Sequence, residues 1–495
     1  MKNKRFSVLV ALFNGIIVMS ISASCTLGAL KPEGNITNYD GYYTTDKFSI
    51  DNQRINNSVY RYTTNPIGNQ KILVVPVHCS TGPTWTDTRL SRLESAFFGE
   101  SEETAWESVS SFYSKSSYGR LNLTGEVYSV FEVSFTPSQI GLYDGLYSNQ
   151  VGIDFHKLLS AKDPQTLRNY DVDKDGYVDA VAFIYSNSAV NSAFWAWVGW
   201  NTDVRPSKNI PGLNNYMWAS YNFMDGVTSD TRPVADTYIH ETGHLLGLDD
   251  YYHRVSSSPK PIYDYSPLGG LDMMDQSISD HNAYSKMLLG WTYPYVIDGS
   301  KNQTTIAIKP FESSGDVIII PSEWNGAALD EYLMIEYYTP TGLNEYHATY
   351  TPVGVEKNRG FTKSGVKILH VDARVAELGY SSTKQDYVFK RFIASKPNYS
   401  GANYLPAASN ISAWSVLDNK EYKLVHLMEA GGVNTFRTSN AKASNGSLFV
   451  EGDTFTASDV FFFNNDKFNN GKEVGYSISI GEMNAAGVTI VITKL

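Results

Sequence analysis

Cysteine is nearly absent from this 495-residue chain, which has only Cys25 and Cys79. Cys25 lies in the N-terminal stretch, whereas Cys79 ends the apolar segment ILVVPVHC, so no disulfide is expected between them. A framework of disulfides, the usual support of small exported domains, is therefore excluded. Bound metal ions are the alternative means of stabilising such a chain.

An excess of positive charge is also lacking. Forty Lys and Arg residues stand against 51 Asp and Glu residues, so the formal net charge is 40 − 51 = −11. Nucleic acid, a polyanion, is not an expected partner of so acidic a chain. Beyond the N-terminus no apolar run approaches the length of a membrane-spanning helix, and no internal repeat or long low-complexity tract is present.

The N-terminus holds the one extended apolar run. Three basic residues stand within the first five positions, and the small residues SAS follow the run at positions 22–24. This order is typical of a secretory signal peptide, so residues 1–24 are predicted to direct export and to be removed. Cys25 comes next, and ISASC resembles the lipobox of bacterial lipoproteins, with Ser22 where leucine is usual. Free secretion and a lipid anchor on Cys25 at the outer face of a bacterial membrane both fit this pattern.

Two longer regions differ in their sequence pattern. Between residues 68 and 297, strand-like segments such as KILVVPVHC alternate with helix-like segments such as HNAYSKMLLGW, which predicts a mixed α+β domain. From residue 298 to 495, short apolar runs are divided by Gly, Ser, Asn and Pro, which predicts an all-β, sandwich-like region. Residues 25–67 are polar without a helical period, and we expect a tail or linker there.

Two histidines stand four positions apart in YIHETGHLLGLDDYY. On a helix, His240 and His244 would share one face, from which both imidazoles can reach a single Zn²⁺. Glu241 lies one step around the helix. It would not bind the metal but could take a proton from metal-bound water as a general base.

A third ligand is expected after the helix. Gly247 can adopt a positive φ and end the helix, so the chain can turn and bring Asp250 to the metal. The pattern H-E-x-x-H-x-x-G-x-x-D is an aspartate variant of the metzincin motif, with Asp249 and His253 as rival third ligands. The gluzincin class takes a glutamate from a following helix, but residues 242–311 contain no glutamate.

A second metzincin feature lies downstream, where SPLGGLDMMDQ places Met273 and Met274 in a glycine-flanked turn. Metzincins have such a Met-turn beneath the zinc. HETGHLLGLDDYY, GGLDMMD and HNAYSKMLLGW together resemble the M6 family of secreted bacterial metallopeptidases, the immune inhibitor A-like enzymes. SSFYSKSSYGRLNLTGEV, EYLMIEYYTPTGLNEYH and GVKILHVDAR are similar to other segments of that family. The likeness runs from about residue 70 to about residue 375.

The resemblance implies a metzincin-like fold, one catalytic zinc ion and endopeptidase activity on proteins or peptides. Residue by residue, it implies a catalytic base at Glu241, a Met-turn at Met274 and three zinc ligands: His240, His244 and Asp250. Gln276 departs from those metzincins that have a tyrosine there to assist the oxyanion. The alternative function is a non-enzymatic surface adhesin with a structural zinc, although a purely structural site does not need a glutamate base.

A second candidate metal site is the acidic loop DVDKDGYVD. Ca²⁺ binds several oxygen ligands, and the sharp turn of a calcium loop needs a glycine. Ala182 replaces the bidentate glutamate of an EF-hand, so a complete EF-hand is not expected, and a solvated acidic turn is the alternative. The predicted ligands of a structural calcium ion, with Tyr177 acting through its carbonyl, are Asp171, Asp173, Asp175, Tyr177 and Asp179.

Overall fold

The computed structural model describes residues 34–46, 55–56, 64–140, 146–189, 194–201, 203–225, 231–252, 263–275, 277–324, 326–349, 360–384, 386–393, 399–400, 404–437, 442–458 and 467–495. The predicted signal peptide, Cys25, His253 and Gln276 lie outside these residues, so the predictions made for them stay predictions. Among the described residues, no helix has the length and apolar character needed to cross a membrane.

The N-terminal region is built on a mostly parallel sheet, and one of its inner strands carries KILVVPVHC. The strand order is β5-β4-β7-β9-β8, with β6 also paired to β4, and only β8 runs antiparallel, at one edge. β4 and β7 are buried on both faces, which explains their continuous apolar sequences. The strands are β4 (Gly68–Cys79), β5 (Leu121–Val127), β6 (Phe131–Val133), β7 (Val181–Tyr185), β8 (Trp197–Trp200) and β9 (Asn215–Ser220).

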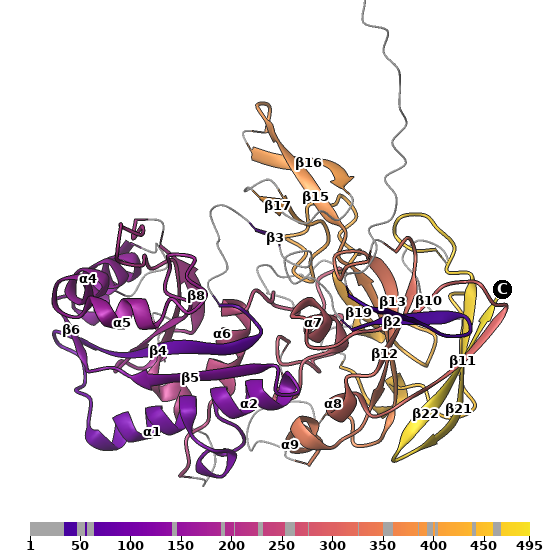
Figure 1. The fold of residues 1–495 in the computed structure, drawn as a ribbon, viewed down its shortest axis with the longest axis horizontal. Coiled ribbons are helices and arrows are strands. Elements are labelled where there is room, and N and C mark those ends of the chain that lie inside the picture. The colour runs from indigo at the N-terminus through magenta and orange to yellow at the C-terminus, as the bar shows by residue number, and fades with distance from the viewer. Residues whose placement is uncertain are drawn as a thin grey trace, which may run out of the picture.

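Helices cover both faces of this sheet (Figure 1). One face, which includes Ile72 and Val74 of β4, packs against α1 (Asp87–Phe98), α2 (Val109–Ser116) and α6 (Asp236–Leu245). The opposite face packs against α4 (Leu146–Lys162) and α5 (Pro164–Asn169), which follow the short helix α3 (Pro137–Ile140). The mixed α/β region predicted from the sequence pattern is confirmed at this level.

The C-terminal region is rich in strands and has two sheets packed face to face, but it is not all-β as predicted, because short helices lie at Phe311–Ser314 and Glu345–Thr349. The larger has the order β1-β2-β10-β12-β13-β14-β19, and the smaller has the order β11-β22-β21-β20. Their facing side chains form one buried apolar group, and β11 alternates between exposed and buried residues as a strand with one covered face does. The strands of the larger sheet are β1 (Ile36–Asn38), β2 (Tyr42–Thr45), β10 (Tyr295–Ile297), β12 (Val317–Pro321), β13 (Glu331–Tyr338), β14 (Gly365–Asp372) and β19 (Val425–Met428). Those of the smaller are β11 (Gln303–Ile308), β20 (Thr454–Phe455), β21 (Tyr476–Asn484) and β22 (Gly487–Lys494).

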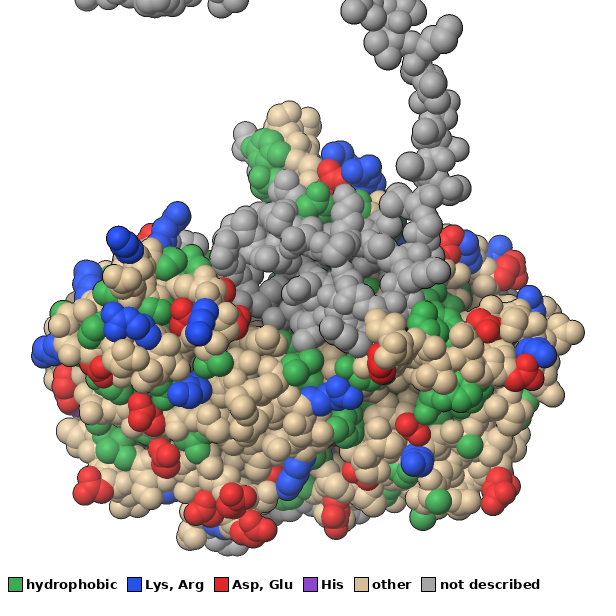
Figure 2. All heavy atoms as spheres, viewed as in Figure 1, with side chains coloured by type: hydrophobic (Ala, Val, Ile, Leu, Met, Phe, Trp, Pro, Cys, Tyr) green, Lys and Arg blue, Asp and Glu red, His purple; other side chains and the backbone are tan. Residues whose placement is uncertain are grey.

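A hairpin projects from this body at the top of Figure 1. It consists of β15 (Val375–Ser381) and β16 (Asp386–Ile393), with β18 (Tyr404–Pro406) paired to β15. Figure 2 shows apolar and basic side chains gathered on it, and Tyr380 and Tyr387 near its tip are 62% and 50% exposed. The remaining elements are the two-residue strands β3 (Ile55–Asn56) and β17 (Tyr399–Ser400), and the short helices α7 (Ala283–Leu288), α8 (Phe311–Ser314) and α9 (Glu345–Thr349).

The sequence predicts a tail or linker at residues 25–67, but the structure has strands β1 and β2 within that range. β2 pairs antiparallel with β10, and the Tyr42 and Tyr295 rings meet edge to face. These strands lie at the edge of the large sheet and are short, polar and partly exposed, so they lack the apolar pattern by which strands are recognised. The segment 25–67 is therefore not only a linker.

The two regions also share a core. The face of the large sheet that carries Ile319, Met334 and Leu369 belongs to the same buried group as Met287 and Trp291 at α7. Figure 1 shows α6 and α7 between the N-terminal sheet and the large C-terminal sheet. Residue 297 therefore marks a change of sequence pattern, while described residues on both sides of it belong to one buried core.

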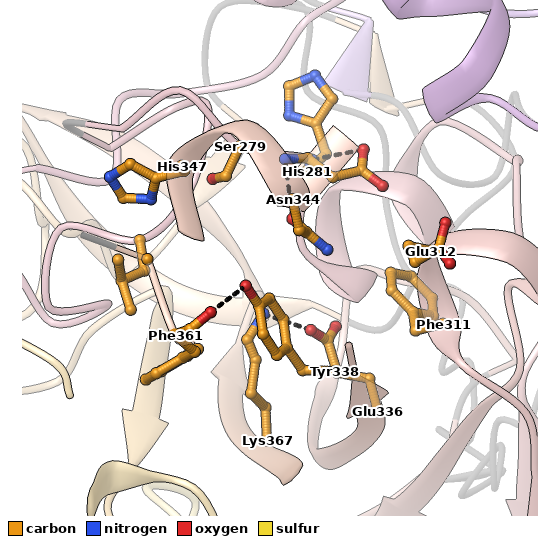
Figure 3. A pocket seen from close by; sticks show the side chains of 13 residues that line it. Ser279, His281, Phe311, Glu312, Glu336, Tyr338, Asn344, His347, Phe361 and Lys367 are labelled. Atoms are coloured by element: carbon orange, nitrogen blue, oxygen red, sulfur yellow. Dashed lines mark hydrogen bonds and ion pairs between the residues drawn. The ribbon is translucent and has the colours of Figure 1, made fainter. Parts of the chain in front are cut away.

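A polar pocket lies at this junction (Figure 3). On its floor Glu336 of β13 forms an ion pair with Lys367 of β14, and the other Glu336 oxygen accepts a hydrogen bond from the Ala283 backbone N–H at 2.9 Å. Asp280 and Lys286 form a second buried ion pair with an Oδ2–Nζ distance of 2.5 Å. The start of α7 is thus bound to the large sheet by a charge-assisted hydrogen bond as well as by apolar packing.

The buried His426 predicts a pH dependence of stability. Burial, with the nearby His370 and Lys423, lowers the pKa of His426 to about 3, while the unfolded chain has a histidine pKa of about 6.5. Below pH 6.5 the unfolded state therefore binds a proton that the folded state excludes. The free energy of unfolding decreases as the pH is lowered. For this one group the loss is roughly 2 kcal/mol between pH 8 and pH 5.

Urea denaturation of the wild type and of His426→Gln at pH 8 and pH 5 measures this effect. The variant is expected to lose less stability than the wild type on acidification. Equal losses in the two proteins would show that His426 takes up its proton in the folded state.

Candidate metal centre

α6 carries the two histidines of the predicted metal site and ends where the sequence predicts. Gly247 has φ 98°. Its N–H donates to the His244 carbonyl at 3.0 Å, and the Leu248 N–H donates to the Gly243 carbonyl at 3.0 Å. This pair of bonds is a Schellman motif, which turns the chain sharply back after a helix. The turn brings the residues after Leu248 under the face of α6 that presents the histidines.

Both imidazoles are oriented by backbone carbonyls. His240 Nδ1 lies 2.8 Å from the Met273 carbonyl oxygen, and His244 Nδ1 lies 2.7 Å from the Leu248 carbonyl oxygen. A carbonyl can only accept, so each Nδ1 carries the hydrogen in the neutral ring. Each Nε2 is thereby left with a lone pair for a metal ion, the arrangement usual for metal-binding histidines.

Asp250 completes the group. Its Oδ1 lies 3.2 Å from His240 Nε2 and 3.1 Å from His244 Nε2. Bonds of 2.0–2.1 Å in a tetrahedral zinc site place neighbouring ligand atoms roughly 3.3 Å apart, so these separations and the donor set of two nitrogens and one oxygen fit zinc. Asp249 is exposed and outside the group, which favours Asp250 over that rival. The other rival, His253, lies outside the described residues.

The negative charge of the Asp250 carboxylate also favours a cation at this position. Burial disfavours the charged form of Asp250, but the adjoining His244 and His240 outweigh burial and hold the pKa of Asp250 well below its usual range. The carboxylate, which is 2% exposed, is therefore negative at any physiological pH. The two histidines are the positive partners of this buried anion in the structure, and a metal ion bound to neutral imidazoles would take over that role.

Glu241 lies on α6 between the two histidines in sequence and is 5% exposed. Burial lowers the pKa of His244, whereas the charges of Asp250 and Glu241 raise it, to about 9. The Glu241 carboxylate is thus near the histidine pair but is not one of the three converging ligands. That is the placement expected of a general base beside a metal ion.

The turn at residues 271–275 lies directly beneath α6. A Cβ atom added at Gly243 would come within 2.5 Å of Met274 Sδ, so Met274 occupies the space that a side chain between the two histidines would need. The carbonyls of Met273 and Met274 accept hydrogen bonds from His240 Nδ1 and the Tyr251 N–H. The predicted Met-turn residue is therefore in contact with the helix of the candidate site.

Substitution of Gly243 by alanine tests this contact. Alanine usually stabilises a helix interior by about 1 kcal/mol relative to glycine, but overpacking a core costs about 1–3 kcal/mol. We expect the clash with Met274 to prevail, so Gly243→Ala lowers the free energy of unfolding by up to ~2 kcal/mol. Chemical denaturation provides the measurement. Gly243→Ala in a Met274→Ala background should be neutral or stabilising, and an equal loss in both backgrounds would contradict the contact.

Sequence reasoning missed Asp272, which organises the turn. Asp272 is fully buried, and its Oδ1 accepts a hydrogen bond from the Met274 N–H at 2.7 Å. Its Oδ2 accepts bonds from the backbone N–H and the side-chain amide of Asn282, at 2.7 and 2.8 Å. Burial raises the pKa of Asp272 to about 6 in spite of these donors. The sequence shows only that aspartates flank Met273 and Met274 on both sides, and nothing in it indicates which of them orders the turn.

The acidic loop after α5 brings three of the five predicted calcium ligands together. Carboxylate oxygens of Asp171, Asp173 and Asp175 lie within 4.8 Å of one another. Asp179 is fully buried beside them: its Oδ2 accepts from the Val172 N–H at 2.6 Å, and its Oδ1 has no hydrogen bond among the described residues. Burial, with the three neighbouring carboxylates, raises the pKa of Asp179 to about 8. For the fifth predicted ligand, Tyr177, the structure shows an N–H bond to Asp175 Oδ1 at 2.8 Å.

We expect calcium to raise the melting temperature of the wild type, because a ligand bound only by the folded state stabilises it. At a free concentration 100 times the dissociation constant the gain is about 2.7 kcal/mol. The double variant Asp171→Ala/Asp173→Ala should lose this gain. Thermal unfolding with and without calcium checks it, and the absence of a calcium-dependent shift in the wild type would reduce the loop to a solvated acidic turn.

No protein-family model matches this chain, and no curated protein matches it. The resemblance to M6 metallopeptidases is therefore a prediction carried by the motifs. The geometry of the site is independent of that resemblance, since it brings His240, His244 and Asp250 together around one point.

Proposed function

We propose that this chain is an exported zinc endopeptidase of the metzincin-like M6 type, acting on extracellular proteins or peptides. The observation that carries the proposal is the convergence of His240 Nε2, His244 Nε2 and Asp250 Oδ1, with both Nδ1 atoms held by carbonyls. A buried glutamate adjoins this group on the same helix. The metzincin-like character is supported by the Schellman turn at Gly247 and by Met274 beneath α6.

Zinc held by these three residues would supply a Lewis acid, which lowers the pKa of a water molecule and polarises the scissile carbonyl. The chain's own groups perform the proton transfers. The Glu241 carboxylate accepts the proton of the attacking water and passes it to the nitrogen of the leaving amine. The Met273 and Leu248 carbonyls keep the two imidazoles oriented throughout, so no reorganisation of the ligands is needed.

Digestion of casein by the purified full chain tests the proposal. We expect cleavage that a chelator abolishes and that added zinc restores. The rival function, a surface adhesin with a structural zinc, predicts a zinc-bound protein that cleaves nothing. Glu241 favours the enzyme over that rival, because a purely structural zinc site does not need a general base.

The place of action is part of the proposal and rests on the N-terminal sequence. Residues 1–24 have the order of a signal peptide, and Cys25 would carry the lipid if the protein is anchored. Mass spectrometry of the mature N-terminal peptide distinguishes the two forms. An acylated Cys25 means a lipid anchor at the outer face of the membrane, and a free cysteine on protein in the medium means secretion.

A further inference from the structure

We propose that the C-terminal β region holds the metal centre in position, with Asn410 as the positioning residue of the third ligand. The inference rests on the proposed function, since it takes His240, His244 and Asp250 as the metal ligands. Asn410 lies in the loop between β18 and β19, 160 positions after Asp250 in the sequence. The two are linked in the fold through one residue, Tyr251.

Tyr251, the residue next to the third ligand, is held at three points. Its backbone N–H donates to the Met274 carbonyl at 2.7 Å, and its hydroxyl is 2.8 Å from Ser285 Oγ on α7. Its carbonyl accepts a hydrogen bond from Asn410 Nδ2 at 3.2 Å. Tyr251 is 1% exposed, so these bonds are shielded from water. They determine where the chain leaves Asp250, and hence where Oδ1 can lie.

Asn410 is itself fixed to the large sheet. Its Oδ1 accepts from the Val425 N–H at 3.1 Å, and its Nδ2 donates to the Val425 carbonyl at 3.0 Å as well as to Tyr251. Val425 begins β19, which pairs with β14. The side chain is 1% exposed. The position of Tyr251 is thereby fixed relative to β19, the edge strand of the seven-stranded sheet.

The same edge holds the segment that carries the Met-turn. The Leu427 N–H of β19 donates to the Pro267 carbonyl at 2.9 Å, and the Ala443 N–H donates to the Gly269 carbonyl at 3.1 Å. Lys423 Nζ donates to the Tyr263 carbonyl at 2.7 Å. The carbonyl that orients His240 therefore lies on a segment bound along its length by the C-terminal region.

Two routes thus run from the β region to the ligands, one through Asn410 to Asp250 and one through residues 263–275 to His240. Partners that orient metal ligands typically contribute 10–100-fold to metal affinity or activity. Removing the Asn410 amide would free the Tyr251 carbonyl and allow Asp250 to sample other positions. Because Asn410 acts one residue beyond the ligand, the zinc dissociation constant is expected to rise by about tenfold in Asn410→Ala, the lower end of that range.

The matched control is Asn201→Ala. Asn201 is also 1% exposed, its Nδ2 donates to the Asn149 carbonyl at 2.8 Å, and its Oδ1 accepts from the Asp203 N–H at 3.0 Å. It belongs to the N-terminal region but contacts α4, on the face of the sheet opposite α6. A general loss of stability would affect both variants, whereas the positioning role predicts weaker zinc binding only in Asn410→Ala.

The experiment uses the full chain and measures zinc affinity by competition with a chelating indicator, alongside melting temperature and the visible spectrum of the cobalt-substituted protein. We expect Asn410→Ala to weaken zinc binding and change the cobalt spectrum, while Asn201→Ala keeps both wild-type values at a similar melting temperature. If Asn410→Ala does not fold, Asn410→Asp takes its place, since it keeps the acceptor for the Val425 N–H and loses the donor to the Tyr251 and Val425 carbonyls.

Zinc affinity within twofold of wild type in the folded variant would overturn the positioning role of Asn410. The proposed function would still stand if the wild type binds zinc and cleaves protein. A wild type that binds no zinc would overturn both, and the two failures are thereby distinguished.

Discussion

Replacing Glu241 by glutamine is expected to lower peptide hydrolysis by about 10²–10⁴-fold, the contribution typical of a positioned general base. Glutamine has nearly the same size, so the 5% exposed position keeps its packing. Its amide cannot accept the proton of the attacking water. The three converging ligand atoms belong to other residues, so zinc binding should be unchanged.

The measurement combines the rate of cleavage of a quenched fluorescent peptide with zinc content per chain. Zinc retained with activity lost is the result that the base mechanism requires. Wild-type activity in Glu241→Gln would show that another group takes the proton. Loss of zinc together with activity would mean that Glu241 holds the metal site together and is not only a base.

Substitution of Asp250 by alanine is expected to have the largest effect on metal binding. The carboxylate lies 3.1–3.2 Å from both Nε2 atoms and is the only negative ligand of the group. Its loss leaves two neutral imidazoles, so zinc affinity should fall by more than the roughly 10–100-fold that loss of an outer partner costs. Activity should fall with it.

Asp249→Ala is the natural control. It removes a carboxylate at the neighbouring position, where the side chain is exposed. It should keep zinc affinity near that of the wild type. His253→Ala completes the series, and titration of all three against a zinc indicator ranks them. If His253→Ala empties the site while Asp250→Ala does not, the third ligand is His253.

The local part of the metal centre could be predicted from the sequence, because helix geometry alone determines it. Two residues four apart on a helix face the same way, so His240 and His244 had one plausible arrangement. Gly247 was recognisable as the helix end because glycine adopts positive φ at low cost. The structure has that end at Gly247, with φ 98°.

The parts that depend on distant residues could not be read in the same way. Asp272 and Asn410 act through hydrogen bonds to backbone groups of Met274 and Tyr251, and any polar residue could in principle make such bonds. Which one does so depends on how the large sheet packs against α7. The spacing of residues in the sequence does not predict that packing.

The fold shows the same division. β4 and β7 could be predicted because strands buried on both faces are continuous apolar runs. β1 and β2 could not, because they are short, polar strands at a sheet edge, held by the pairing of β1 with β2 and of β2 with β10. The shared core of the two regions could not be predicted either. β12 and β13 have buried residues on both faces, and the sequence does not indicate which elements pack on each face.

The most direct test of the metal centre is anomalous diffraction at the zinc absorption edge, from crystals of the full chain grown with zinc. The account predicts one strong peak about 2.0–2.2 Å from each of His240 Nε2, His244 Nε2 and Asp250 Oδ1. A zinc ion bound elsewhere, with no peak between these three atoms, would contradict it.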